Sequence, residues 1–152
     1  MSVIRVTKEF GFEAAHALYN YDGQCSNIHG HSYRLFVTVK GCPLDEPSHP
    51  KNGMVVDFSV LKEIVVRRII EPLDHSFIVY GASPQSGIPG SLVGKGVGMK
   101  IVEFPCPPTC EMMLADFASR ILPELPSGIE LHSMRLYETA TSYAEWFAED
   151  NR

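Results

Sequence analysis

The 152-residue sequence predicts an α+β fold in which a four-stranded antiparallel sheet carries two helices on one face. Two observations predict it. Apolar residues recur at every second position near both ends of the chain, and at three- and four-residue spacing in two segments between them. The expected order is therefore strand, strand, helix, helix, strand, strand. Because this length is typical of one domain and the composition does not change abruptly, we expect residues 1–152 to form a single domain.

The first half of the predicted sheet comes from residues 3–16 and from the segment that begins at His29. In the first segment apolar side chains alternate along the chain, and His16 falls on the buried parity. In the second segment the odd positions from His31 to Val39 are largely apolar, whereas the even positions are largely polar. This alternation is typical of antiparallel strands with one buried face.

Two amphipathic helices are predicted between the two pairs of strands. Residues 58–70 carry apolar side chains at helical spacing, with Asp57 as the N-terminal cap and Pro72 as the residue that closes the segment. The second helix is expected to begin at Thr109, whose hydroxyl is a good cap, and to bury apolar side chains such as that of Phe117.

The remaining segments are two connections and the last pair of strands. Residues 41–53 are rich in proline and other turn residues. Residues 81–98 carry six glycines and two prolines, so we expect a mobile glycine-rich loop there rather than a helix or a long strand. Residues 129–138 and 142–148 are predicted as the final two strands, joined by a short polar turn.

The composition disfavours several classes of protein. A net charge of −5 without a run of basic residues argues against binding to nucleic acid. No stretch approaches the roughly 20 apolar residues of a membrane span. The first ten residues lack the features of a signal peptide, so we expect a cytoplasmic protein. The four cysteines are irregularly spaced, which favours free thiols or site residues over a disulfide framework.

The segment from Cys25 to His31 carries the strongest chemical signal. His29 and His31 are two residues apart, so on a strand their rings point to the same face and can converge on one metal ion. His16, on the buried face of the preceding strand, can supply a third nitrogen. Three histidines leave a fourth position open, which is typical of catalytic zinc, and we therefore expect Zn²⁺.

The ordinary alternatives stay open for each residue taken alone. A single histidine is more often a hydrogen-bonded residue of a core or a surface than a ligand. Cys25 alone is more often a buried small apolar residue. Beside a metal ion, however, a thiol has a lowered pKa and becomes a usable base, so the combination favours a site in which Cys25 acts beside the metal.

Two further groups of polar residues are less specific. In Asp74-His75 the carboxylate can orient the ring and tune its proton affinity, but such pairs also occur at helix ends for capping alone. Glu138 could be a solvated residue at the end of a strand, or a carboxylate that binds the edge of a guanidine-like ring through paired N–H groups. The sequence alone favours the solvated alternative.

Taken together, these residues resemble the superfamily of 6-pyruvoyltetrahydropterin and 6-carboxytetrahydropterin synthases. The resemblance is carried by motifs in family order along nearly the whole chain. They are Phe12-Glu13-Ala14-Ala15-His16, Cys25-Ser26-Asn27-Ile28-His29-Gly30-His31, Val56-Asp57-Phe58, Leu73-Asp74-His75, Pro108-Thr109-Cys110-Glu111 and Tyr137-Glu138-Thr139. Such ordered agreement is far more specific than any one motif.

The resemblance implies a fold, an assembly and a set of roles. It implies the tunnelling fold, in which sheets of several subunits join into a barrel, two trimers stack as a homohexamer and active sites lie between subunits. It also implies a pterin as the small-molecule substrate. The roles that it implies are zinc on His16, His29 and His31, proton acceptance by Cys25, a relay by His75 supported by Asp74, pterin anchoring by Glu138, and a pocket position for Thr109.

Within this superfamily, the three-residue gap between Cys25 and His29 is similar to that of bacterial 6-carboxytetrahydropterin synthases of queuosine and deazapurine biosynthesis. The resemblance thus implies conversion of 7,8-dihydroneopterin triphosphate and water into 6-carboxy-5,6,7,8-tetrahydropterin, acetaldehyde and triphosphate. The alternatives are a 6-pyruvoyltetrahydropterin synthase, which eliminates triphosphate, and a non-catalytic zinc- or pterin-binding module. The chain departs from the family after His75, where Ser76–Val79 leads into the glycine-rich loop, and no basic cluster for the triphosphate is apparent.

Overall fold

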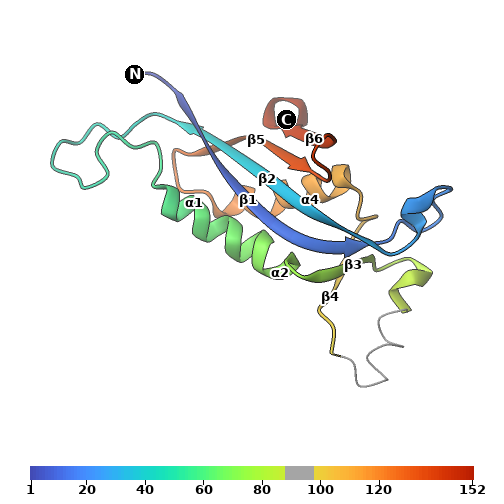
Figure 1. Ribbon diagram of the computed structural model, residues 1–152. Coiled ribbons are helices and arrows are strands. Elements are labelled where there is room, and N and C mark those ends of the chain that lie inside the picture. Colours follow the sequence, from blue (N-terminus) through green and yellow to red (C-terminus); the bar gives the residue numbers. More distant parts are fainter. Residues whose placement is uncertain (88–97) are drawn as a thin grey trace.

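The protein is described by a computed structural model over residues 1–87 and 98–152, in which a curved sheet is the central feature (Figure 1). The sheet has six strands in the order β4-β3-β1-β2-β5-β6. The strands are β1 (Ile4–His16), β2 (His29–Gly41), β3 (Ser76–Tyr80), β4 (Ile101–Phe104), β5 (Glu130–Tyr137) and β6 (Tyr143–Phe147). Strands β1, β2, β5 and β6 pair antiparallel, whereas β3 pairs parallel with both β1 and β4.

The prediction of a four-stranded antiparallel sheet is therefore wrong, because the sheet is mixed and gains β3 and β4 between the two helices. Four of the five residues of β3 are buried, so the strand has no alternation of apolar and polar side chains and resembles any short apolar run. Strand β4 has only four residues. Parallel pairing at one edge of the sheet thus left no periodic signal in the sequence.

The first long helical segment consists of α1 (Phe58–Val65), a π-helical turn (Val66–Ile70) and α2 (Glu71–Leu73). The predicted cap is confirmed, because the Asp57 carboxylate accepts a hydrogen bond from the backbone N–H of Ser59 at 2.8 Å. The second, α4 (Cys110–Ile121), begins at Thr109, whose hydroxyl accepts from the N–H of Met112 at 3.3 Å. Short 3₁₀ turns cover Gln24–Ser26, Pro84–Ser86, Leu122–Glu124 and Ala148–Asn151.

The first helical segment extends three residues past its predicted end at residue 70, because Pro72 lies inside it and it ends at Leu73, directly before Asp74. Proline lacks an N–H and would leave the carbonyl four residues earlier, that of Arg68, without its helical partner. Here the guanidinium of Arg120 donates to that carbonyl at 3.2 Å. The π-helical turn, closed by a bond from the Glu71 N–H to the Val66 carbonyl, lies directly before the proline.

The core lies between the sheet and the helical segments, which pack on the same face of the sheet. It is formed by side chains of β1, β2, β5, α1 and α4 that are nearly inaccessible to solvent, among them Phe12, Tyr33, Leu35, Leu61, Ile69, Phe117, Ile121 and Met134. The opposite face of β1 and β2 carries paired polar side chains, such as Glu9 with Arg34 at 2.7 Å. The two faces therefore differ in polarity, as the alternating pattern of these strands predicts.

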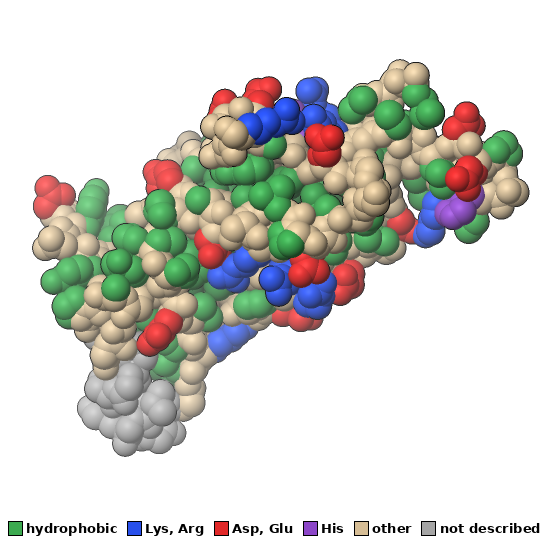
Figure 2. All heavy atoms as spheres, turned by 180° about the vertical axis from the view of Figure 1, so that it is seen from behind, with side chains coloured by type: hydrophobic (Ala, Val, Ile, Leu, Met, Phe, Trp, Pro, Cys, Tyr) green, Lys and Arg blue, Asp and Glu red, His purple; other side chains and the backbone are tan. Residues whose placement is uncertain are grey.

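Residues 81–87 form turns and one short 3₁₀ helix after β3, and residues 88–97 of the predicted glycine-rich loop lie outside the described residues. On the face shown in Figure 2, Lys and Arg side chains are interspersed with Asp and Glu side chains. No helix in the described part of the chain has the length and apolar character that crossing a membrane requires.

Candidate metal centre

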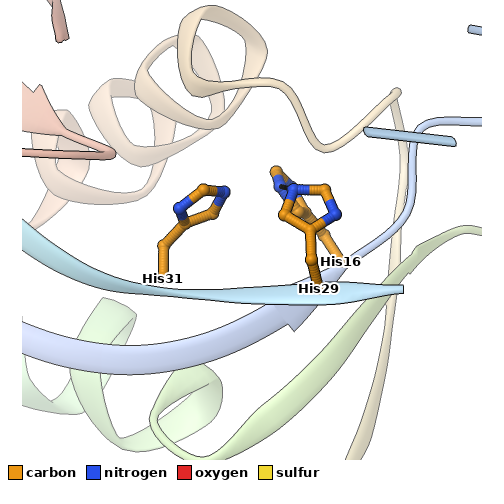
Figure 3. A group of neighbouring side chains, drawn as sticks. All are labelled: His16, His29 and His31. Carbon is orange, nitrogen blue, oxygen red and sulfur yellow. Dashed lines mark hydrogen bonds between the residues drawn. The ribbon is translucent and has the colours of Figure 1, made fainter. Parts of the chain in front are cut away.

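Three histidines converge beside the sheet, on the face that the helices cover. The antiparallel register of β1 and β2 places His16 directly opposite His29, and His31 follows two residues later on β2 with its ring on the same side. Figure 3 shows the three rings pointing toward one another. One ring nitrogen from each lies within 4.8 Å of the others, so the group that the sequence predicted is confirmed as a cluster.

Backbone carbonyls fix the orientation of two of these rings. The Nδ1 atom of His16 lies 2.7 Å from the carbonyl oxygen of Pro108, and the Nδ1 atom of His29 lies 2.7 Å from that of Asn27. A carbonyl can only accept, so both Nδ1 atoms carry the proton and both Nε2 atoms present a lone pair. These two Nε2 atoms lie 3.0 Å apart. Two facing lone pairs repel each other unless a cation lies between them. Histidines that ligate a metal are typically held in this way, with the other ring N–H donated to a backbone carbonyl.

The third histidine has an open coordination atom as well. The Nε2 atom of His31 is buried and forms no hydrogen bond within the described residues. The Glu138 carboxylate lies 3.4 Å away, close enough for charge attraction but not aligned as a hydrogen bond. A buried nitrogen without a partner is costly, so its position beside the other two nitrogens fits a shared metal ligand.

Burial favours the neutral, metal-binding form of His16 and His31. The pKa of His16 is lowered to about 4, mainly by burial of the ring. The hydrogen bond to the Pro108 carbonyl raises this pKa, and the neighbouring His29 and His31 lower it. Burial and His29 also lower the pKa of His31, although Glu138 opposes them. At neutral pH His16 and His31 therefore offer uncharged imidazole nitrogens, and His29 places its Nε2 atom beside them. This donor set fits a divalent transition metal with an open fourth position.

A cavity of about 390 Å³ adjoins the cluster and brings together three residues that the sequence singled out. Cys25, Thr109 and Glu138 all line it, and Glu138 links it to the cluster through its contact with His31. The remaining lining residues are Leu18, Tyr21, Cys110, Glu111, Ser142, Tyr143 and Ala144. The cavity can thus hold a small molecule beside a thiol and a carboxylate, and that carboxylate lies 3.4 Å from a ring nitrogen of the cluster.

Local backbone bonds place Cys25 and Glu138 at this cavity. Cys25 lies in a 3₁₀ turn, and its carbonyl accepts a 2.8 Å hydrogen bond from the N–H of Leu18 just after β1. Glu138 follows β5, and its N–H donates to the carbonyl of Ser142 at 3.1 Å across the turn to β6. The Glu138 side chain is only 25% exposed, so it is not the solvated strand end that the sequence alone favoured.

Asp74 and His75 lie elsewhere in the same chain. The Asp74 carboxylate lies 3.1 Å from Nδ1 of His75 and accepts a 2.9 Å bond from the N–H of Glu13. That N–H is the main cause that lowers the pKa of Asp74, with further lowering by His75 and Lys100. The pair exists as predicted, but His75 borders a second hollow of about 380 Å³, which His31 also lines and Cys25 does not, and the His75 side chain is 78% exposed.

Some residues of the site could not be found by sequence reasoning. Pro108 supports His16 only through its backbone carbonyl, which has no signature in the sequence, and it reaches the histidine across 92 positions of the chain. Tyr21 and Glu111 line the cavity. Glu111 belongs to the motif Pro108-Thr109-Cys110-Glu111, which could have indicated it, whereas Tyr21 lies in a connection without periodicity.

Comparison with known proteins extends over almost the whole chain. The family model described as 6-pyruvoyl tetrahydropterin synthase matches residues 5–149. A 6-carboxy-5,6,7,8-tetrahydropterin synthase of Haemophilus influenzae is 35% identical over 144 residues, which cover 95% of this chain and 99% of the relative. One of Aquifex aeolicus is 32% identical over 164 residues, with coverage of 95% and 98%.

The fold is also similar to that of solved structures. A 6-pyruvoyl tetrahydropterin synthase of Caenorhabditis elegans has a TM-score of 0.65 at 20% sequence identity, with 97% of each chain covered. The synthase of Plasmodium falciparum has a TM-score of 0.68 at 21% identity, with 96% of this chain and 98% of that chain covered. At such identities the likeness concerns the fold alone.

Proposed function

Because the chain belongs to the 6-pyruvoyl tetrahydropterin synthase family, we propose that it is a 6-carboxy-5,6,7,8-tetrahydropterin synthase. Its reaction would convert 7,8-dihydroneopterin triphosphate and water into 6-carboxy-5,6,7,8-tetrahydropterin, acetaldehyde and triphosphate. The observation that carries the proposal is full-length similarity to curated bacterial enzymes of that name. The cavity lined by Cys25 and Glu138 supports it, because a substrate-sized volume and reactive groups coincide there and Glu138 also contacts His31 of the cluster.

We propose that His16, His29 and His31 hold Zn²⁺. Their three ring nitrogens and the open fourth position are the donor set that catalytic zinc prefers. The chemistry that zinc supplies at such a site is Lewis-acid polarisation of a substrate oxygen, which lowers the cost of proton removal nearby. The carbonyls of Pro108 and Asn27 would keep the first two rings in the ligating tautomer.

The residues of the cavity then take separate roles. Cys25 would accept the proton, since a cation close to a thiol favours the thiolate. Glu138 would bind the paired N–H groups of the pterin ring, which a carboxylate accepts in a bidentate manner. Thr109 would line the ring pocket beside it. Fixing the ring at Glu138 aligns the side chain of the substrate with the metal, which is how positioning lowers a reaction barrier.

We propose that His75, supported by Asp74, completes the active site of a neighbouring copy in a homohexamer. Within one chain His75 and Cys25 border different hollows. The exposed ring of His75 is available to a neighbour, and the uncovered face of the sheet leaves room for association. The single-domain organisation, the cytoplasmic location and a place in queuosine or deazapurine biosynthesis stay predictions.

The proposed reaction is tested by incubating the purified, zinc-loaded protein with 7,8-dihydroneopterin triphosphate and trapping the released acetaldehyde. Acetaldehyde is the expected product. Triphosphate without acetaldehyde would instead indicate a 6-pyruvoyltetrahydropterin synthase, and unchanged substrate would indicate a non-catalytic binding module. Protein treated with a chelator is the matched control, because removal of the metal should abolish turnover.

A further inference from the structure

The turn that carries Asp74 and His75 is held in an unfavourable backbone conformation. His75 has a φ of 57°, in the left-handed region that residues other than glycine seldom adopt. Strand β1 restrains one side of the turn, because the carbonyl of Glu13 accepts a 2.6 Å bond from the His75 N–H. A conformation of this kind persists only where its surroundings hold it.

Lys100 restrains the other side of the same turn. Its ammonium group donates to the carbonyl of Asp74 at 2.8 Å and also to the carbonyl of Glu71. Its own carbonyl accepts a 2.9 Å bond from the N–H of Phe77. Lys100 is therefore bonded to the residue directly before His75 and to the residue two positions after it.

The position of the Lys100 ammonium is also favourable electrostatically. Glu71 and Asp74 lie in the last turn and at the C-terminal cap of the helical segment that runs from α1 through α2, where carbonyls lack helical partners and carry partial negative charge. A cation there satisfies these carbonyls. The same cation helps to lower the pKa of the Asp74 carboxyl group, although the Glu13 N–H is the main cause, so the carboxylate that orients His75 stays ionised.

From these contacts we propose that Lys100 is a positioning residue that fixes His75 for proton transfer; this inference rests on the function proposed above. Lys100 acts through the backbone of the turn and does not contact substrate. It directly precedes β4, an edge strand whose partner in the sheet is β3. Through its hydrogen bonds, Lys100 connects the edge of the sheet to the turn that carries Asp74 and His75.

Three variants test this role in the zinc-loaded enzyme. Lys100→Met removes the charge and the donor while keeping the length of the side chain, and Lys100→Arg keeps both. Lys62→Met is the matched control, since Lys62 is an exposed lysine of α1. We expect Lys100→Met to lower kcat about tenfold with KM changed less than twofold, because proton transfer depends on alignment. Lys100→Arg should recover most of kcat, and Lys62→Met should behave as wild type.

Amide hydrogen exchange gives a second measurement that needs no turnover. The His75 amide should exchange about tenfold faster in Lys100→Met than in the other two variants and the wild type, because the turn opens more often. An unchanged kcat, a rise in KM alone, or unchanged exchange at His75 would each overturn the inference. If the wild type released no acetaldehyde, the proposed function would fail, and the exchange comparison would still decide whether Lys100 holds the turn.

Discussion

At the scale of single residues, the charge state of His16 couples the metal site to stability. Its pKa in the folded protein is about 4, below the usual 6.5, mainly because the ring is buried. Between these two values the unfolded chain binds more protons, so stability increases with pH there. We expect the metal-free protein to lose about 3 kcal/mol of unfolding free energy from this group as the pH falls from 6.5 to 4.

Urea unfolding of the metal-free protein across this pH range measures the effect. The exposed His49 provides the control, because replacing it with Gln should leave the pH dependence as it was. Stability that does not change between pH 6.5 and 4 would contradict the account of a buried, neutral His16.

Cys25 is expected to contribute to turnover but not to metal binding. It lines the cavity, whereas the metal cluster consists of histidines. We therefore predict that Cys25→Ala lowers kcat by at least about 100-fold, the usual effect of losing a proton-transfer group, while the zinc content stays at the wild-type value. Acetaldehyde release and elemental analysis measure the two quantities. Cys42→Ala, at an exposed cysteine, is the control, and full activity of Cys25→Ala would refute the role.

The face of the sheet on which each strand residue lies was predictable, because successive side chains of a strand point to opposite faces. The buried parity of His16 and the two-residue spacing of His29 and His31 sufficed to predict their convergence, which the structure confirms. The partners that orient the rings were not predictable, since any residue can offer a backbone carbonyl. The separation of His75 from Cys25 depends on the path of the chain through β3, which the sequence prediction lacked.

At the scale of elements, helix caps and alternating strands were predictable from local chemistry. Asp57 and Thr109 cap their helices as expected, and β1 and β2 lie within a residue of their predicted start or end. Strands β3 and β4, at one side of the sheet, depend on parallel pairing between distant segments. Their short, largely apolar sequences carry no alternation, so their topology could not be predicted locally.

The Asp57 cap allows a test at this scale. Replacing Asp57 with Ala removes the acceptor for the Ser59 N–H and should lower the free energy of unfolding by about 1 kcal/mol. Asp57→Asn retains a side-chain oxygen and should lose much less. Urea unfolding of both variants measures the difference. Equal stabilities for Asp57→Ala and the wild type would show that this bond does not stabilise the helix.

At the scale of the whole molecule, the proposed sharing of active sites between copies can be tested by mixing two inactive variants. Cys25→Ala retains His75, and His75→Ala retains Cys25. If each site takes these residues from different subunits, refolding the two together at equal amounts should restore about a quarter of the wild-type activity, the share expected from random assembly of a symmetric oligomer. Each variant refolded alone is the control. Failure to recover activity in a mixed oligomer would place both residues in one chain.

The proposed reaction is tested most directly by the ratio of its two released products, acetaldehyde and triphosphate. Acetaldehyde and triphosphate should be measured together during turnover of 7,8-dihydroneopterin triphosphate by the zinc-loaded protein. The proposed 6-carboxy-5,6,7,8-tetrahydropterin synthase activity predicts that the two accumulate in equal amounts. Triphosphate that accumulates without acetaldehyde would contradict it.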